Sequence, residues 1–176
     1  LDLKFRHFKV WVAASTHKEE EIFCAKAHIK LKKNNKNLIT VIIPRHINRV
    51  NEIISEMNKL NLKTALHSSR IKNLENIDIY VVNTFGDSKK FYKIGSTVFL
   101  GKSLAIKGGQ NPLEAVHYDS KIIHGPYVDN FKDVYKLLKS LNISKKINTP
   151  KQLSSLVSFN KKKKKAKKVK KIGRTI

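Results

Sequence analysis

The chain is poor in cysteine, and this shortage limits the chemistry it can perform. Its single cysteine, Cys24, has no partner for an internal disulfide, and its place in a helical pattern predicts a buried, inert thiol. No cysteine–histidine group has zinc-site spacing, and no Asp-x-Asp pair could hold a divalent metal beside a nucleotide. We therefore expect neither a bound metal nor a cofactor.

A signal peptide and long apolar runs are also absent. Hydrophobic residues make up 40% of the 176 residues, which is enough for one sizeable core, so we expect one domain with appendages. Because a transmembrane helix needs about 20 consecutive apolar residues, we expect a soluble fragment in which no segment spans a membrane.

Acidic residues are scarce, and the formal net charge is +24. Lysine outnumbers arginine by 32 to 5, whereas sequence-specific DNA readers favour arginine on a recognisable module, and no such module is visible. The last 16 residues supply 10 of these charges and leave +14 for the rest. We expect no nucleic-acid partner. The alternative, a basic nucleic-acid-binding protein, would keep salt-sensitive affinity for RNA or DNA without its tail.

Apolar runs of strand length alternate with helical patterns along the chain. A capping box of Thr16 and Glu19 predicts the start of the first helix, and Thr149-Pro150 predicts the start of the last. Strands are predicted over residues 9–14, 38–43, 62–66, 77–82, 97–100 and 121–123, and helices over residues 16–33, 50–60, 87–92, 129–141 and 149–159.

This alternation predicts an α/β fold, a Rossmann-like parallel sheet with helices on both faces. Residues 38–43 form a continuous apolar run, which is typical of a strand covered on both sides. In such sheets ligands bind at the carboxyl ends of the strands, near the switch in strand order. We call this edge of the sheet the rim.

Four loop clusters are predicted to lie on the rim. Their hydroxyl, guanidinium, glycine and carboxylate groups suit a nucleotide that carries a phosphate. The clusters are Ser15-Thr16-His17, Pro44-Arg45-His46, Phe85-Gly86-Asp87 and Gly108-Gly109-Gln110-Asn111-Pro112-Leu113-Glu114.

The last cluster has the most detailed pattern. Gly108 and Gly109 let the backbone approach a bulky group, and Pro112 suits a first helical turn, whose free N–H groups favour a phosphate. Glu114 offers a carboxylate to sugar hydroxyls. The alternative is a capped helix that follows a glycine loop.

The four clusters are followed along the chain by Gly125-Pro126 and Asn130-Phe131. This series of motifs resembles the C-terminal half of bacterial 3-deoxy-D-manno-octulosonic acid (Kdo) transferases. The resemblance runs from about Val10 to Leu141. It implies the C-terminal domain of a GT-B glycosyltransferase that moves Kdo from CMP-Kdo to a lipid A precursor in lipopolysaccharide biosynthesis. It also implies an inverting, metal-independent reaction at the cytoplasmic face of the inner membrane, with a peripheral location.

The resemblance further implies which residues bind the donor. Arg45 suits the phosphate and Glu114 the ribose, while Asn111 and the Gly86 backbone close around the nucleotide. No catalytic residue is expected in this chain, because the base and the acceptor site are implied to lie in an N-terminal domain. The implied donor-binding residues are Pro44, Arg45, Phe85, Gly86, Asp87, Asn111, Pro112, Leu113 and Glu114, with Ser15, Thr16, His46, Gly108 and Gly109 as further candidates.

The sequence departs from the family pattern at four positions. Asn83 stands for Asp, Asp87 for Glu, Gln110 for His and Asn48 for Glu. The shorter acid at Asp87 alters how its loop reaches the ligand. Leu3-Lys4-Phe5 is similar to a family motif whose lysine steadies the transition state, but it lies too close to the first strand, so Lys4 is interpreted as a surface lysine.

Several candidates also have simpler interpretations. Ser15 and Thr16 are helix caps first and ligand contacts second, Asp87 caps the following helix, and His46 either orients its loop or touches the nucleotide. Five other histidines are interpreted as structural or solvent-facing: His17, His28, His67, His117 and His124.

The predicted organisation is a leading segment (1–8), a donor-binding domain (9–145), a C-terminal helix (146–160) and a disordered lysine-rich tail (161–176). Nine lysines lie in the segment that starts at Lys161 and ends at Lys171, which predicts disorder and attraction to an anionic membrane surface. A UDP-sugar-using GT-B transferase is the alternative among enzymes, and the nucleotide that binds decides between the two.

Overall fold

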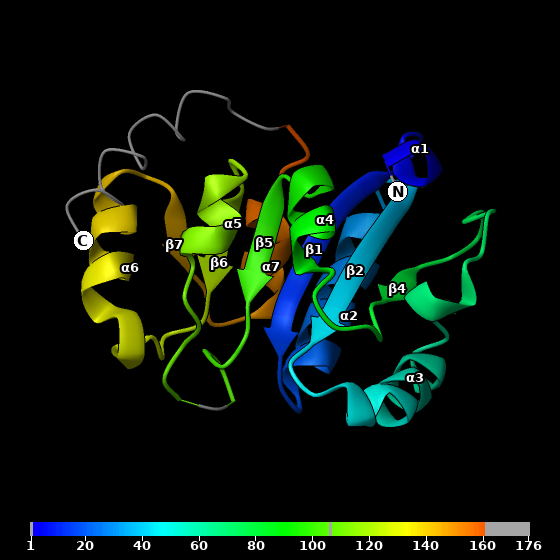
Figure 1. The fold of residues 1–176 in the computed structure, drawn as a ribbon, viewed down its shortest axis with the longest axis horizontal. Helices are drawn as coiled ribbons and strands as arrows, with labels where there is room; N and C mark the ends of the chain where they lie inside the picture. The colour runs from blue at the N-terminus through cyan, green and yellow to red at the C-terminus, as the bar shows by residue number, and fades with distance from the viewer. Residues whose placement is uncertain (1, 106, 161–176) are drawn as a thin grey trace.

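The described residues form one parallel sheet of seven strands. The computed structural model describes residues 2–105 and 107–160. The order of the strands in the sheet is β3-β4-β2-β1-β5-β6-β7, and all pairs are parallel (Figure 1). The strands are β1 (Lys9–Thr16), β2 (Leu38–Pro44), β3 (Thr64–Leu66), β4 (Ile79–Val81), β5 (Thr97–Leu100), β6 (Lys121–His124) and β7 (Ser144–Lys146).

The chain switches sides of the sheet at β1. After β1 it builds β2, β3 and β4 on one side, and then β5, β6 and β7 on the other. The loop after β1 leads to a helix on one face of the sheet, and the loop after β5 leads to a helix on the other. These two loops therefore diverge, which is the geometry that opens a binding crevice in such sheets.

Helices cover both faces of the sheet, as predicted (Figure 1). One face carries α1 (Asp2–Phe5), α4 (Ser88–Ile94), α5 (Leu113–His117) and α6 (Lys132–Ser140). The other carries α2 (Glu20–Lys32), α3 (Val50–Lys59) and α7 (Pro150–Leu156). Short 3-10 turns connect elements: η1 (Ile47–Arg49), η2 (His67–Ser69) and η3 (Asp129–Phe131).

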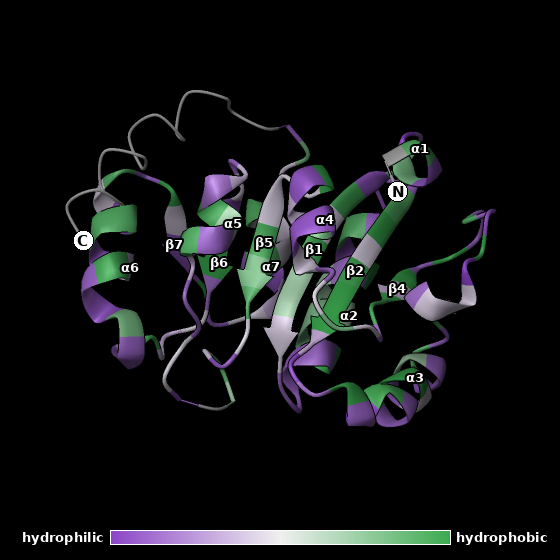
Figure 2. Cartoon of the chain, in the orientation of Figure 1, coloured by the Kyte–Doolittle hydropathy of each residue, from purple (hydrophilic) through white to green (hydrophobic). Residues whose placement is uncertain are grey.

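Alternation along β1 divides the core into two layers. Val10, Val12 and Ala14 pack toward α4 and α5, whereas Trp11 and Ala13 pack toward α2 and α7. Every residue of β2 is buried, which confirms the continuous apolar strand predicted there. The central strands are correspondingly the most hydrophobic part of the ribbon (Figure 2).

The strand β7 was not predicted from the sequence. Only its first residue, Ser144, is buried, while Lys145 and Lys146 are exposed. It pairs with β6 through the backbone, with Ile122 opposite Ser144, so its formation depends on main-chain bonding that leaves no hydrophobic pattern. The expectation of six strands was wrong for this reason.

Other element boundaries differ from the predictions by a few residues. The strand predicted from Leu62 begins at Thr64, although Leu62 itself is buried in the core. The last helix begins as predicted, because the Thr149 side chain accepts a hydrogen bond from the Gln152 amide at 3.1 Å, but it ends at Leu156. The division into a leading segment, domain and C-terminal helix stays a prediction.

Cys24 is fully buried in α2, as predicted, and burial raises the pKa of its thiol. His28 is also buried, so the structural interpretation of this histidine is confirmed. Its Nδ1 lies 2.8 Å from Thr40 Oγ1, and its Nε2 lies 3.5 Å from Asp78 Oδ1.

Candidate functional site

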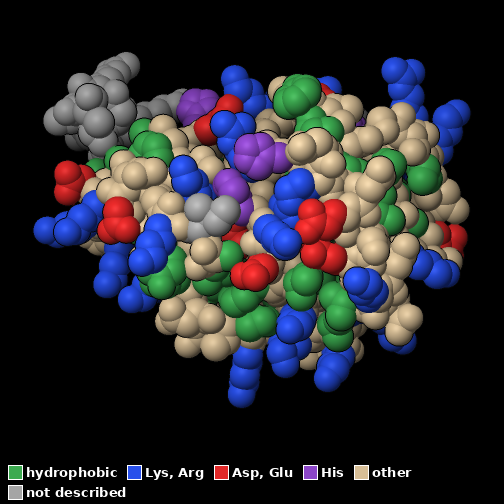
Figure 3. Space-filling view, turned by 90° about the horizontal axis from the view of Figure 1, so that it is seen from below, with side chains coloured by type: hydrophobic (Ala, Val, Ile, Leu, Met, Phe, Trp, Pro, Cys, Tyr) green, Lys and Arg blue, Asp and Glu red, His purple; other side chains and the backbone are tan. Residues whose placement is uncertain are grey.

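The rim is the lower edge of the sheet in Figure 1, and Figure 3 views it from below. All strands are parallel, so the loops after β1, β2, β4, β5 and β6 leave from this edge. Cationic, acidic and histidine side chains gather near the middle of this face (Figure 3). The predicted placement of the four loop clusters on one edge is therefore confirmed.

The loops after β1 and β2 are joined directly. The Arg45 amide donates to the Thr16 carbonyl at 3.0 Å, and the rings of His17 and His46 meet edge to face with centroids 5.6 Å apart. Pro44 is buried at the end of β2, while Arg45 and His46 are exposed. A rigid strand end therefore presents the Arg45 guanidinium to solvent at the rim.

Glu20 connects the β1 loop to the β5 loop, and the sequence analysis missed this role. Its fully buried carboxylate accepts from the amides of His17 at 3.0 Å, Lys102 at 2.8 Å, Ser103 at 3.3 Å and Leu104 at 3.3 Å. Burial raises the pKa of this carboxyl, and the four amide bonds oppose that rise. The available signal was the run of three glutamates, Glu19 to Glu21, shortly after Thr16-His17.

The capping box predicted for Thr16 and Glu19 is wrong. Glu19 adopts φ 73°, a left-handed conformation, and makes no side-chain cap bond. The Thr16 hydroxyl donates instead to Glu21 Oε1 at 2.9 Å, and Glu20 is the acid that reaches back to a preceding amide. The end of β1 is irregular as well, with a register shift between Ala14 and Thr16.

Arg49, in the turn that follows β2, forms an ion pair with Glu21 at the start of α2. Its guanidinium forks onto Glu21, with distances of 2.9 Å to Oε1 and 3.3 Å to Oε2. The Glu21 carboxylate is fully buried, so this fork compensates a charge that would otherwise be costly. Arg49 is thereby engaged within the protein, whereas Arg45 faces solvent.

Burial lowers the pKa of His17, and three cationic or titratable neighbours lower it further: His46, Lys102 and Arg45. A hydrogen bond to the Ser15 carbonyl at 3.1 Å acts in the opposite direction. The ring is therefore neutral at pH 7. Ser15 itself adopts φ 54°. It therefore shapes the turn after β1, and it is not the helix cap that was predicted, because the N-cap of α2 is Glu19.

The glycine pair packs closely against the loop that follows β6. A Cβ on Gly108 would lie 2.7 Å from Asn130 Nδ2, and one on Gly109 would lie 2.8 Å from Val128 Cα. Both glycines have positive φ, 126° and 78°. The Gly109 amide also donates to the Lys102 carbonyl at 2.7 Å. The close approach that these glycines allow joins two rim loops.

The motif correctly predicted a helix start, but α5 begins at Leu113, so Pro112 is its N-cap residue and does not lie in the first turn as predicted. Asn111 Oδ1 accepts from the Leu113 amide at 3.0 Å, and Pro112 precedes the helix. Glu114 is exposed, with its Oε1 3.8 Å from Lys89 Nζ on α4. This ion pair places the beginning of α4 beside the beginning of α5.

The loop after β4 presents Phe85 and Gly86 to solvent. Phe85 is 87% exposed, and Gly86 has φ 76° with open space around it. Asp87 accepts from the Thr84 hydroxyl and lies 2.6 Å from Lys90 Nζ. The bonds from Lys90 and Thr84 lower the pKa of Asp87. Asp87 precedes α4 but makes no side-chain cap bond, so the simpler interpretation as a cap is wrong.

Lys4 is not the ordinary surface lysine that we expected. It is half-buried, and its Nζ donates to the Tyr80 hydroxyl at 3.1 Å. The same hydroxyl lies 2.8 Å from His67 Nδ1. The short distance in sequence to β1 led to that expectation, but Phe5 anchors the segment in the core, with its ring centroid 5.1 Å from that of Tyr80.

The structure joins some rim clusters directly and others through side chains. Ser15 to His17, Arg45-His46 and the 102–109 loop share hydrogen bonds or ring contacts. Residues 85–87 and 111–114 are linked through Lys89 and Glu114. The β2 and β5 strands flank β1, so the loops bearing Arg45 and Glu114 leave the sheet about 10 Å apart, two strand spacings.

The amino-acid sequence of this chain is similar to those of known proteins. The chain is 31% identical over 156 residues to the Kdo transferase of Rickettsia prowazekii, covering 86% of this chain and 34% of that protein. It is 30% identical over 129 residues to the Haemophilus influenzae Kdo transferase, covering 73% and 30%. The chain thus spans about a third of the length of these relatives. No protein-family model matches it.

A solved structure has the same fold. The C-terminal CMP-Kdo binding domain of WaaA from Acinetobacter baumannii superposes with a TM-score of 0.82 at 24% identity, covering 89% of this chain and 82% of that one. The parallel sheet and its covering helices define a Rossmann-like α/β domain of the GT-B type. The homologues of this chain are Kdo transferases, and the resemblance to their C-terminal part is confirmed.

Within residues 2–105 and 107–160, no three side chains of His, Cys, Asp or Glu are grouped so that they could hold a metal ion. Nor does any helix there have the length and hydrophobicity that a bilayer-spanning segment needs. The lysine-rich tail, residues 161–176, lies outside the described residues.

Proposed function

We propose that this chain is the donor-nucleotide-binding half of a Kdo transferase that moves Kdo from CMP-Kdo to a lipid A precursor. The observation that carries the proposal is the rim, where three loops meet at the switch in strand order and expose Arg45 and His46. The sequence similarity to Kdo transferases and the fold shared with a CMP-Kdo binding domain support it.

Arg45 has the chemistry to bind the phosphate of CMP. Its backbone is fixed by the bond to Thr16, so its guanidinium loses little freedom when it forms a bidentate contact. Glu114 is exposed and ionisable at the other side of β1, where it can accept from two ribose hydroxyls. Asn111 and the open backbone at Gly86 complete the nucleotide site between them.

The same contacts assist the chemical step in this proposal. When the glycosidic bond breaks, negative charge accumulates on the phosphate of the departing CMP. A preorganised guanidinium stabilises that charge more in the transition state than in the ground state. We propose an inverting reaction that needs no metal, with the catalytic base and the acceptor site in the part of the relatives that this chain does not match. The reaction is proposed to occur at the cytoplasmic face of the bacterial inner membrane.

Titration with CMP, UMP and AMP tests the assignment. CMP is expected to shift the NMR signals of Arg45, Gly86 and Asn111, and Arg45→Ala or Glu114→Ala is expected to weaken CMP binding. Loss of a charged hydrogen bond costs about 1.5–3 kcal/mol, which is roughly tenfold or more in affinity.

Matched controls are Arg6→Ala and Glu75→Ala, because both residues are exposed and lie away from the rim. These variants should bind CMP as the parent chain does. Preference for UMP would favour the UDP-sugar alternative. If millimolar CMP moves none of the three rim signals, the donor site is assigned to the wrong residues.

A further inference from the structure

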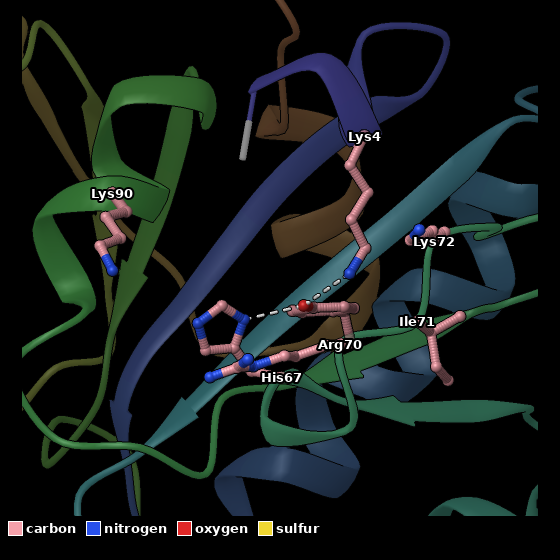
Figure 4. Close-up of a pocket in the computed structure, with 7 residues that line it drawn as sticks. Lys4, His67, Arg70, Ile71, Lys72 and Lys90 are labelled. Atoms are coloured by element: carbon pink, nitrogen blue, oxygen red, sulfur yellow. Dashed lines mark hydrogen bonds between the residues drawn. The ribbon is translucent and has the colours of Figure 1, made fainter.

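A basic pocket, distinct from the rim, lies beside the loop that follows β4. It is bounded by α1, η2 and α4. Its volume is about 470 Å³. Figure 4 shows that its labelled side chains come from segments far apart in the sequence. The dashed lines that start at Lys4 and at His67 are their hydrogen bonds to the Tyr80 hydroxyl. The polar groups that line it are Lys4, His67, Arg70, Lys72, Tyr80 and Lys90.

The floor of the pocket is a chain of hydrogen bonds. Lys4 Nζ donates to the Tyr80 oxygen at 3.1 Å, and the same hydroxyl is hydrogen-bonded to His67 Nδ1 at 2.8 Å. On the other side of the ring, His67 Nε2 lies 3.7 Å from Asp87 Oδ2. Burial raises the pKa of Tyr80 to about 12 and lowers that of His67, so both side chains are neutral at pH 7.

Among the side chains that the structure describes, none forms an ion pair with the Lys4 ammonium. The ammonium is half-buried, and its contacts are the neutral Tyr80 hydroxyl and the face of the Tyr80 ring, 4.9 Å from Nζ. Burial lowers the pKa of Lys4, which reflects the cost of desolvating an unpaired cation. An anion in the pocket would remove that cost.

The charge of the lining indicates the class of ligand. Of the described side chains that line the pocket, four are lysine or arginine and none is a carboxylate. Asp87, behind His67, neutralises Lys90 at 2.6 Å, so three cations remain for a ligand: Lys4, Arg70 and Lys72. A phosphate monoester carries nearly two negative charges and three acceptor oxygens at pH 7, which matches three cationic donors better than a carboxylate does.

We propose that this pocket binds a phosphate monoester, separately from the nucleotide site at the rim. The proposal does not depend on the proposed function, because it rests on the pocket's own charges and hydrogen bonds. Arg70 would provide the planar fork for two phosphate oxygens, while Lys4 and Lys72 neutralise the remaining charge. Asp87 connects the two regions, since it belongs to the loop that also presents Phe85 and Gly86.

Glycerol 3-phosphate is a suitable probe, with the ring signals of His67 as the readout. Binding is expected to shift these signals and to raise the pKa of His67, because a nearby dianion favours the imidazolium. Arg70→Gln should weaken binding about tenfold or more. Arg70 is an exposed loop residue, so this variant leaves the core untouched.

Lys151→Gln is the matched control, since it removes one exposed positive charge on α7, at the opposite face of the sheet. It should bind the probe as the parent chain does. Equal weakening by Lys151→Gln and Arg70→Gln would overturn the proposal, because it would show a response to net charge alone. Unchanged binding in Arg70→Gln would overturn it as well.

Two further experiments test whether the pocket is separate from the donor site and whether its ligand is a lipid headgroup or a free phosphate. With saturating CMP, or in Arg45→Ala, glycerol 3-phosphate should still shift the His67 signals; competition by CMP would assign the pocket to the donor site and overturn a separate one. If CMP does not bind at all, the phosphate result still stands. Vesicles with phosphatidic acid, compared with phosphatidylglycerol vesicles, distinguish a lipid-borne monoester from a free one.

Discussion

The Asp78 carboxylate, which lies just before β4, contacts three residues from α2 and from the segment before β3. It accepts from the Lys63 amide at 2.9 Å, and its Oδ1 lies 3.5 Å from both His28 Nε2 and Lys32 Nζ. Burial alone would raise the pKa of Asp78, but the bonds from His28 and Lys63 and the charge of Lys32 lower it to about 2. The folded state therefore holds this carboxylate ionised far below its ordinary range.

The depressed pKa predicts a pH-dependent stability. Because the pKa of Asp78 is lower in the folded than in the unfolded chain, its contribution is complete above about pH 4 and is lost as the pH falls toward 2. Asp78→Asn should lower the free energy of unfolding by about 2 kcal/mol at pH 7, with a smaller difference from the parent at pH 3. Urea unfolding at both pH values measures this.

Asp129→Asn is the control, since Asp129 is exposed, and it should change stability little at either pH. A loss in Asp78→Asn that is the same at pH 7 and at pH 3 would contradict the ionic explanation.

At the scale of elements, two glycines of the rim loops, Gly86 and Gly109, allow a matched comparison. Gly86 and Gly109 both have φ near 77°, but a Cβ on Gly86 meets nothing within 4 Å, whereas one on Gly109 lies 2.8 Å from Val128 Cα. Gly86→Ala should cost about 1–2 kcal/mol from backbone strain alone. Gly109→Ala should cost roughly 1–3 kcal/mol more, because backbone must move.

Urea unfolding of both variants measures the difference, and NMR signals of residues 125–131 show whether that loop shifts. Equal losses in the two variants would mean that the close approach of Gly109 contributes nothing beyond its φ.

The sequence predicted those elements whose hydrophobic pattern is strong. β2 is fully buried and apolar except for Thr40, and it was predicted within one residue. The helical spacing of residues 50–60 located α3. β7 was missed because three mostly polar residues form it through backbone pairing with β6. Local pattern carries no information on a partner strand twenty residues away.

The rim was predictable as a place but not in its internal contacts. Parallel topology places Arg45 and Gly109 at one edge, whatever their side chains do. The role of Glu20 depends on amides of residues 102–104, which are distant in sequence. Lys4 was misjudged for the same reason, since its partner Tyr80 is 76 residues away.

At the scale of the whole molecule, this chain corresponds to about a third of each relative. We predict that the purified chain transfers no Kdo to a lipid A precursor, because GT-B chemistry takes place between two domains. An assay with CMP-Kdo and a lipid A precursor, run beside a full-length Kdo transferase, tests this. Transfer by the purified chain would show that it contains an acceptor site and a base of its own.

The tail beyond the described residues also leads to a prediction. Its nine lysines should attract anionic lipids at roughly 1 kcal/mol each near the surface. Co-sedimentation should show binding to anionic but not to neutral vesicles, lost at high salt and lost in a chain that ends at Asn160. Equal binding by the shortened chain would assign the attraction to the remaining +14.

The polar strand β7 has a consequence for how the molecule behaves among its own copies. An outermost strand exposes unpaired main-chain groups that can recruit a strand from another molecule. Here the strand is three residues long, and its exposed positions are Lys145 and Lys146. A second copy added edge to edge would bring two pairs of ammonium groups together. Like-charge repulsion should therefore end the sheet at this strand and protect the protein from aggregating through it.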